Sequence, residues 1–234
     1  MCFPTSLVIH VSTSHTCCEH YADHIIATVS QEFGNVHSHA IHAIIPAEAG
    51  LNISINVIPP TASCPFITLF TTGLSDQAMN VPKGQDQFQY SELIMHLPPG
   101  WPLPQEDALQ PQEWFWPFEW LAKLAYYPHL HNTWLGGATA IMAPEEKPRR
   151  LAPNTTLSCF MLLADFAECS PIIINDDRVV KLYTVIPIHT DEREFERKHG
   201  VIALLQKLQE EGYTAVVNIG RPSVIDEPDV FELD

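Results

Sequence analysis

Apolar residues first recur at helical spacing in the N-terminal part of the chain. Residues 16–19, Thr-Cys-Cys-Glu, have the form of a capping box, in which side chains satisfy the free amides at a helix start. Gly34 supplies a left-handed residue of the kind that ends helices. The apolar positions between them are Ala22, Ile25, Ile26, Val29 and Phe33. The spacing predicts a helix of about 17 residues with one face against a core.

Apolar and polar residues then alternate, which is typical of strands. Residues 51–57 alternate with a period of two, and a pair of prolines ends this predicted strand. Residues 66–71 follow after a short connection, so the two segments predict a hairpin, and Gly73 opens a turn after it. Residues 91–97 form a further predicted strand, which ends at Pro-Pro-Gly.

The second half of the chain mixes helices and strands. Pro117 suits the first position of a helix whose apolar face continues to Ala125. Thr190, followed by two acidic residues, predicts a second helix with an oxygen cap, and residues 201–208 carry a third apolar stripe. Strands are predicted at residues 138–143, 157–163 and 179–188. Hairpins with helices at separate points favour an α+β fold, a mixed, largely antiparallel sheet with helices packed on it.

The composition is that of an acidic globular protein. The chain has 234 residues, of which 46% are hydrophobic and 17% charged, so it can bury a core and falls outside the disordered range. Twelve basic and 28 acidic residues give a formal net charge of −16, and no Lys or Arg precedes Lys83. This charge repels nucleic acid and anionic membranes. It favours a protein partner with a basic surface.

The sequence also bears on location. Residues 3–11 are apolar, but Pro4 and His10 interrupt them and no basic residue precedes them, unlike a secretory signal. No apolar run reaches the roughly 18 residues of a membrane-spanning helix. The six cysteines are too scattered to form a disulfide framework. We therefore expect a cytoplasmic protein.

Few motifs point to catalysis. The chain has no glycine-rich phosphate loop, and residues 73–77, Gly-Leu-Ser-Asp-Gln, lack the second glycine of a nucleophile elbow. Metal binding is the chemical alternative, since His20 and His24 share one side of the predicted helix and His37 and His39 would share a strand face. The helical pair lies opposite the apolar stripe, as on a solvated face. We expect no metal site and no cofactor, and these four histidines are the candidate ligands otherwise.

The tryptophans are confined to one part of the chain. Residues 101–117 are proline-rich and irregular, and a predicted helix follows them. The five tryptophans are Trp101, Trp114, Trp116, Trp120 and Trp134. We interpret these rings as packing the helix against the sheet, and an exposed aromatic platform for a partner is the alternative.

Residues 66–82, Phe-Ile-Thr-Leu-Phe-Thr-Thr-Gly-Leu-Ser-Asp-Gln-Ala-Met-Asn-Val-Pro, carry a more specific signal. A strand that ends in a Thr-x-Gly-Leu-Ser turn, followed by a Met and a Pro, resembles the signature of the suppressor-of-fused domain family. Residues 90–98 resemble the next strand of the family, residues 121–128 its central helix, and residues 185–192 its late strand-to-helix turn. The similarity extends over residues 35–212.

The resemblance implies a non-enzymatic protein-binding module. The animal member of the family is similar to this chain only in its N-terminal portion and sequesters a transcription factor, and short bacterial relatives are thought to include immunity proteins that neutralise toxins. The candidate partner-binding residues are Gly73, Ser75, Asp76, Met79, Val81, Trp101 and Trp114. A purely structural turn is the alternative for the first five of these residues. An enzyme or metalloprotein that uses the N-terminal histidines is the alternative for the whole chain.

We divide the chain into three parts on this basis. Residues 1–34 hold the N-terminal helix and its lead-in, and residues 35–212 form the suppressor-of-fused-like domain. Residues 213–234 are an acidic C-terminal tail, in which the last nine residues include five acids. We expect these charges to be solvated.

Overall fold

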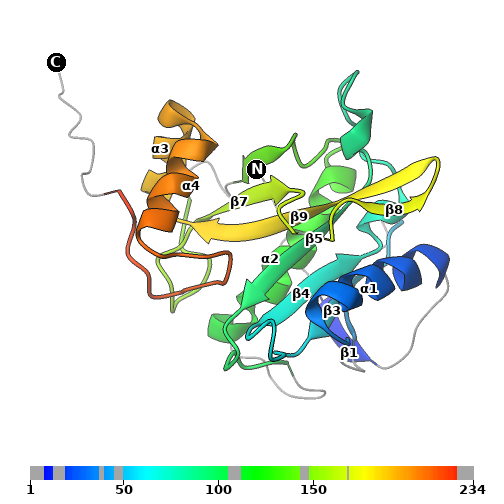
Figure 1. Cartoon of the computed structure of the whole chain (residues 1–234), viewed down its shortest axis with the longest axis horizontal. Helices are drawn as coiled ribbons and strands as arrows, with labels where there is room; N and C mark the ends of the chain where they lie inside the picture. Colours follow the sequence, from blue (N-terminus) through cyan, green and yellow to red (C-terminus); the bar gives the residue numbers. More distant parts are fainter. Residues whose placement is uncertain are drawn as a thin grey trace.

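The fold is built on a nine-stranded sheet with helices on both of its faces (Figure 1). This computed structural model describes residues 8–12, 19–36, 40–44, 50–104, 112–142, 148–167 and 169–225. The strands are β1 (Val8–Ser12), β2 (Ala40–Ile44), β3 (Ile53–Ile58), β4 (Ile67–Thr72), β5 (Ser91–Leu97), β6 (Thr139–Met142), β7 (Cys159–Ala164), β8 (Ile172–Asn175) and β9 (Arg178–Ile188). The α-helices are α1 (Glu19–Phe33), α2 (Gln112–Leu130), α3 (Thr190–His199) and α4 (Val201–Glu210), and short 3-10 turns form η1 (Leu74–Asp76) and η2 (Asp86–Phe88).

The strand order is β1-β2-β3-β4-β5-β9-β7-β6, with β8 paired to β9. The pair β5–β9 is parallel, with Ser91 opposite Lys181, and the other strand pairs among the described residues are antiparallel. The sheet is therefore mixed and largely antiparallel, which confirms the predicted α+β fold. The predicted hairpin of residues 51–57 and 66–71 is the antiparallel pair β3–β4.

The alternation of side chains along β9 defines the layers. Tyr183 and Val185 point into the core beneath α2, whereas Leu182 points to the opposite face, where α1 packs. Ile186 and Ile188 also lie on that opposite face and pack with α4. Because successive strand residues face opposite sides, one apolar strand supplies three hydrophobic clusters.

Helix α2 begins earlier than the sequence predicts. It begins at Gln112 and contains Pro117 in its second turn, so Trp114 and Trp116 are helical and not part of an irregular segment. Proline cannot donate a backbone hydrogen bond, which leaves the carbonyl of Glu113 without its helical partner. Glu113 is exposed to water, and Trp116 is only 1% exposed. Helix α2 thus accommodates Pro117 in its second turn and places the Trp116 ring in the core.

Three strands were missed, and two predicted segments lie outside the described residues. Strands β1, β2 and β8 are short, and Ile-Ile-Ile-Asn in β8 has no alternation. Residues 16–18 of the expected capping box and the acidic residues 226–234 are not described.

None of the described helices combines the length and the apolar character needed to cross a membrane.

Candidate functional site

The turn that carries the family-like motif requires glycine at its first position. Gly73 has a φ of 101°, in the left-handed region. A Cβ atom at this position would lie 2.2 Å from the backbone oxygen of Asn52, which is closer than any real contact. Any other residue would therefore meet both backbone strain and a steric clash. The close approach ties the turn to the start of β3.

A buried carboxylate, Glu92 of β5, lies directly under the turn. Its side chain is fully buried, and Oε2 accepts a hydrogen bond from the Thr71 hydroxyl at 2.6 Å. Oε1 accepts two more, from the Ser75 backbone N–H at 3.0 Å and the Ser75 hydroxyl at 2.7 Å. Both carboxylate oxygens thus hold the turn against the end of β4.

No cation contacts Glu92 among the described residues, and the pKa of this side chain reflects the missing positive charge. Burial raises the pKa of Glu92 to about 7, although the hydrogen bonds from Thr71 and Ser75 oppose the change. The nearby charge of Asp76 raises this pKa further. The three hydrogen bonds stabilise the carboxylate only in part, because hydroxyls and one amide do not replace bulk water.

Arg178, the first residue of β9, holds the other side of the turn. Its Nη1 atom donates to the backbone oxygen of Ser75 at 2.5 Å and approaches that of Asp76 at 3.4 Å. The guanidinium also lies between two aromatic rings, 4.3 Å from the centroid of Tyr21 and 4.2 Å from that of Tyr90. These cation–π contacts join α1, the turn and β9 at one point.

The predicted contact residues of the turn differ in exposure. Gly73, Ser75 and Met79 are buried, and Asp76 and Val81 are partly buried. Burial also raises the pKa of Asp76, against the attraction of Arg178. The side chains exposed on this segment are those of Gln77, Ala78 and Asn80. Sequence reasoning missed these three residues, because it gave more weight to the residues that resemble the family motif than to those between them.

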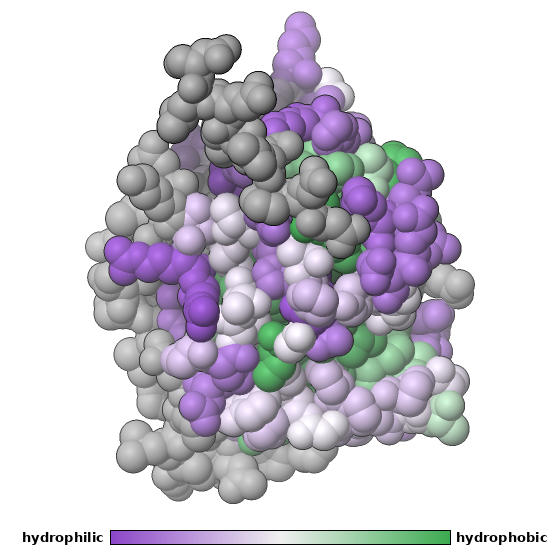
Figure 2. All heavy atoms as spheres, turned by 90° about the vertical axis from the view of Figure 1, so that its left-hand side faces the viewer, coloured by the Kyte–Doolittle hydropathy of each residue, from purple (hydrophilic) through white to green (hydrophobic). Residues whose placement is uncertain are grey.

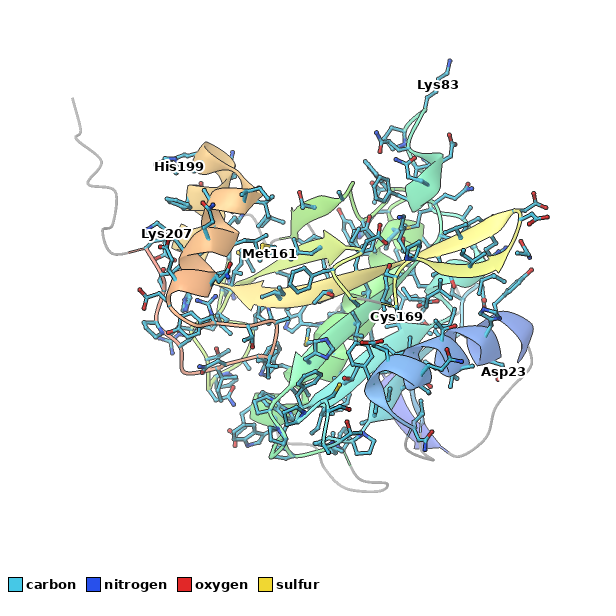
Figure 3. All side chains as sticks on the ribbon, viewed as in Figure 1. Asp23, Lys83, Met161, Cys169, His199 and Lys207 are labelled. Carbon is cyan, nitrogen blue, oxygen red and sulfur yellow. The ribbon has the colours of Figure 1, made fainter. Side chains whose placement is uncertain are left out.

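Lys83 lies at the tip of the loop that continues from this turn. Figure 3 shows its side chain pointing away from the body of the molecule. Two backbone hydrogen bonds hold the base of the loop. The Met79 N–H donates to the backbone oxygen of Gln89 at 2.8 Å, and the Asn80 N–H donates to that of Thr133 at 3.1 Å. The loop thus extends from a base that is bonded to the rest of the fold.

The tryptophan segment packs into the core beneath α2. Trp101 is 6% exposed, and its indole N–H donates to the backbone oxygen of Trp114 at 2.9 Å. The two rings meet edge to face, with centroids 5.2 Å apart. Trp114 is partly buried against the same core. This arrangement agrees with the interpretation that the rings pack a helix against the sheet.

The four candidate histidines are only partly described. His20 and His24 lie in α1, and the side chain of His24 is exposed, whereas His37 and His39 fall outside the described residues. Within the described ranges, no group of three or more His, Cys, Asp and Glu side chains is arranged to hold a metal ion.

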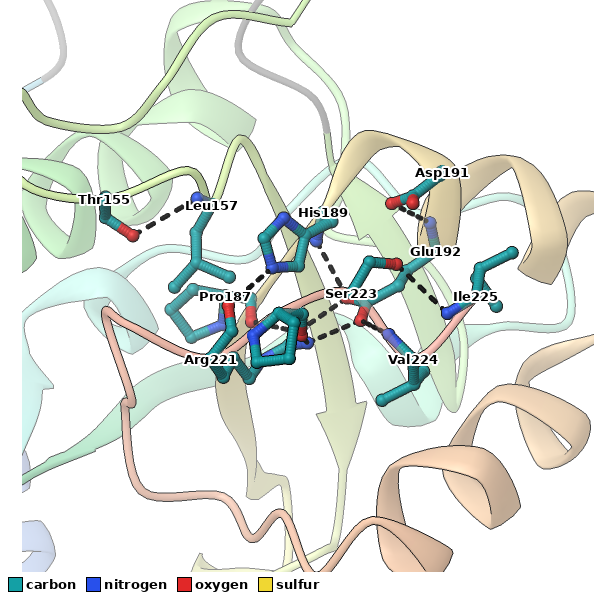
Figure 4. Close-up of polar contacts among 11 residues, drawn as sticks. Thr155, Leu157, Pro187, His189, Asp191, Glu192, Arg221, Ser223, Val224 and Ile225 are labelled. Atoms are coloured by element: carbon teal, nitrogen blue, oxygen red, sulfur yellow. Dashed lines mark hydrogen bonds and ion pairs between the residues drawn. The ribbon is translucent and has the colours of Figure 1, made fainter. Parts of the chain in front are cut away.

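A second buried carboxylate, Glu192 of α3, was not singled out from the sequence as a site residue (Figure 4). Glu192 is fully buried and pairs with Arg221, whose Nη1 and Nη2 atoms lie 2.5 and 2.6 Å from its two oxygens. The backbone amides of His189 and Val224 also donate to Glu192, at 2.8 and 3.0 Å. The pair fastens the C-terminal segment to the start of α3.

The cap of α3 differs from the predicted one. His189 is the N-cap residue, and Glu192 accepts the hydrogen bond from its amide. Thr190 instead shares a hydrogen bond with the Ser158 hydroxyl at 2.7 Å. Burial acts to raise the pKa of Glu192, but hydrogen bonds and charge from Arg221 outweigh it, so this pKa is lowered. The acid three residues after the cap was a signal for this role.

Both carboxylates are therefore committed to internal contacts. Their oxygens accept hydrogen bonds from the chain itself, and neither side chain is exposed to solvent. A general acid or base must reach the group whose proton it moves. In this conformation, Glu92 fastens the motif turn to the sheet, and Glu192 fastens the C-terminal segment to α3.

Known proteins share features of this sequence and of this fold. A profile described as Suppressor of fused protein (SUFU) matches residues 50–222. No curated protein matches the chain. The solved structure described as the Sufu–Fu complex is similar with a TM-score of 0.59 and 16% identity, over 86% of this chain and 91% of that one.

Two further solved structures share the fold. A SUFU homolog from Neisseria gonorrhoeae FA 1090 has a TM-score of 0.50 and 15% identity, over 95% of this chain and 90% of that one. Drosophila Suppressor of Fused is similar with a TM-score of 0.54 and 16% identity over 86% of this chain. The match covers 50% of the Drosophila chain. The profile match includes the Gly73 turn, Glu92, Arg178 and Arg221. The chain therefore belongs to the suppressor-of-fused family.

Proposed function

We propose that this protein is a non-enzymatic binding module that recognises a protein partner with a basic surface. Family membership is the observation that carries the proposal. A relative with the same fold is described as part of the Sufu–Fu complex, so the fold can support a protein interface. A regulatory or immunity-like role, in which binding neutralises the partner, fits this class of protein.

The charge of the chain supports a basic partner. The formal net charge is −16, and the acidic residues outnumber the basic ones by 28 to 12. Such a field accelerates encounter with a cationic surface and disfavours acidic competitors. Screening by salt should therefore slow association.

The motif turn supports the proposal by its rigidity. Glu92 and Arg178 hold the backbone of Ser75 from two sides. Side chains exposed on the same segment, such as Gln77 and Asn80, are thereby presented on an ordered backbone. A surface that is ordered before binding loses less conformational entropy when a partner docks.

Affinity capture followed by reconstitution tests this function. The immobilised protein is exposed to extract of its own cells at low and high salt, and an unrelated protein of similar acidity on the same resin is the control. We expect recovery of a protein rich in Lys and Arg that then binds the purified chain in titration calorimetry, with weaker affinity at high salt. Recovery of no specific protein under either condition would contradict the proposal.

A further inference from the structure

Two exposed apolar side chains, Ile173 and Val179, form a small cluster on the hairpin of β8 and the start of β9. Among the described residues, the exposed large hydrophobic side chains are Phe166, Ile173, Val179 and Ile202. Ile173 and Val179 are register partners across the hairpin and are 65% and 37% exposed. Phe166 lies in the connection that leads from β7 to β8. Single exposed hydrophobic residues are ordinary, but a cluster of them is typical of interaction sites.

The hairpin presents this cluster away from the body of the protein. It projects at the right of Figure 1, above α1 and far from α3 and α4. Ile172 and Val180 are buried against α1, so the alternation of the strands puts Ile173 and Val179 on the outward face. The opposite end of the molecule carries hydrophilic and hydrophobic residues side by side where the described residues are visible (Figure 2).

The rim of this face carries uncompensated negative charge. Asp176 and Asp177 form the exposed turn of the hairpin, and no described residue pairs with their carboxylates. The two basic residues of the hairpin are already engaged, since Arg178 holds the motif turn and Lys181 forms an ion pair with Asp165. An apolar face with an acidic rim complements an apolar side chain with basic neighbours.

The hairpin is also held in place before any partner binds. Arg178 follows the turn directly and contacts the backbone of Ser75 and the rings of Tyr21 and Tyr90. These contacts fix the tip of the hairpin to α1 and to the motif turn. The outward face is thus presented on an anchored element, which lowers the entropic cost of docking.

We propose that this hairpin face docks a protein partner that presents an apolar side chain flanked by Lys or Arg. The inference rests on the function proposed above and names the surface that performs it. Ile173 and Val179 supply the apolar anchor, and Asp176 and Asp177 supply the charge complementarity. Buried anchors contribute most of the affinity of an interface, and rim charges mainly set its rate and specificity.

Peptide binding to the full chain tests the inference. The probes are three short labelled peptides: one alternates Leu and Lys, one has Ser in place of Leu, and one has Glu in place of Lys. The variants are Ile173→Thr with Val179→Thr, which keeps β-branched residues in the strands, and Asp176→Asn with Asp177→Asn, which keeps turn-forming residues. Ile202→Thr is the matched control, because Ile202 is 66% exposed on α4. Circular dichroism and backbone NMR spectra verify that each variant is folded.

We expect the Leu/Lys peptide to bind the wild type and Ile202→Thr equally, and about tenfold more weakly after the double threonine change. The double asparagine change should weaken binding by a few-fold at low salt and by less at high salt. Weaker binding of both the Ser/Lys and the Leu/Glu peptides would support the combined apolar and acidic character of the face.

Three results would overturn the inference, and they separate it from the proposed function. Unchanged binding to the folded double threonine variant would show that the exposed pair only stabilises the hairpin, while a basic partner elsewhere on the chain remains supported. Concentration-dependent dimerisation of the wild type, lost in that variant, would assign the face to a second copy of this chain. Failure of the Leu/Lys peptide to bind any form would contradict the hairpin site, and the affinity capture with reconstitution would then decide separately whether the chain binds a basic partner elsewhere.

Discussion

Glu92 and Glu192 are both fully buried carboxylates, but their environments differ in one respect. Glu92 accepts hydrogen bonds from hydroxyls and an amide, whereas Glu192 also pairs with the guanidinium of Arg221. Burial raises the pKa of Glu92 to about 7, and Arg221 lowers that of Glu192. The comparison shows that hydrogen bonds satisfy the geometry of a buried carboxylate, while a buried cation is needed to compensate its charge.

The difference also separates two tasks. Glu92 holds a surface turn that begins at Gly73, and Glu192 holds the C-terminal segment that contains Arg221. Because its pKa is about 7, Glu92 holds a proton in part of the molecules at neutral pH, which reduces the charge buried under the turn. Glu192 stays ionised, so its ion pair persists over the same range.

Removal of the cation should have the largest effect. Arg221→Met leaves Glu192 buried without its charge partner, and we expect a loss of about 3–5 kcal/mol in the free energy of unfolding. Urea unfolding measures this loss. The double variant Arg221→Met with Glu192→Gln should lose less than the sum of the two single changes, because it removes both charges. Strictly additive losses would show that the ion pair is not the relevant interaction.

Removal of the Glu92 carboxylate should lower the free energy of unfolding somewhat less than the loss of Arg221. Glu92→Ala leaves the amide and hydroxyl of Ser75 and the hydroxyl of Thr71 without their acceptor, and we expect a loss of about 3 kcal/mol. Glu92→Gln keeps one acceptor oxygen and resembles the protonated acid, so it should stay within about 1 kcal/mol of the wild type at acid pH. The comparison would fail if Glu92→Gln destabilised the protein more than Glu192→Gln, which leaves Arg221 unpaired.

The two carboxylates should also give opposite pH dependences. The folded pKa of Glu92 is about 7 and its reference value is 4.5, so the folded state retains a proton that the unfolded state releases. Its contribution to stability therefore falls as the pH rises from 4.5 to about 7. Glu192 has a lowered pKa, so its contribution is present above the reference value and falls as the pH drops through the folded value.

Unfolding measured across this pH range checks the sign for Glu92. The stability of Glu92→Gln relative to the wild type should increase by up to about 3 kcal/mol as the pH rises, since one pKa unit corresponds to about 1.4 kcal/mol. Other titrating groups are common to both proteins and cancel in the difference. A difference that stays constant from acid to neutral pH would contradict the raised pKa.

Removal of Glu194, an exposed carboxylate on α3, the helix of Glu192, should have the smallest effect on stability. Glu194 is 45% exposed in its side chain and pairs with Arg193 and Arg197 at 3.2 and 3.3 Å. Glu194→Ala should change the free energy of unfolding by less than about 0.5 kcal/mol, because water screens both pairs. A loss as large as that of Arg221→Met would mean that burial does not determine the strength of these ion pairs.

Local signals predicted much of the fold. The boundary between α3 and α4 lies at Gly200, and α4 ends shortly before Gly212, as the apolar stripe and the glycines indicate. Strand β5 coincides with the predicted segment of residues 91–97. These elements are set by periodicity and turn residues within a few positions of each other. The start of α2 escaped prediction, because Pro117 suits a first helical position but lies in the second turn of a helix that already includes the buried Trp116.

The candidate site was predicted only in part. The motif directed attention to Gly73 and Ser75, and both belong to the ordered turn. Their partners could not be inferred, since Glu92 lies 17 residues from Ser75 and Arg178 lies 103 residues away. The exposed pair Ile173 and Val179 was also missed, because the sequence does not show which face of a hairpin is covered.

By itself, the sequence determined the acidic charge, the class of fold, most helices and strands, and the glycine that the motif turn requires. These properties depend on composition, on periodicity or on the conformation of single residues. Only the tertiary structure decided which carboxylate gained a cation, which motif side chains turned inward and which hairpin face stayed open to solvent. Those outcomes depend on contacts between distant segments, and such contacts exist only once the sheet has assembled.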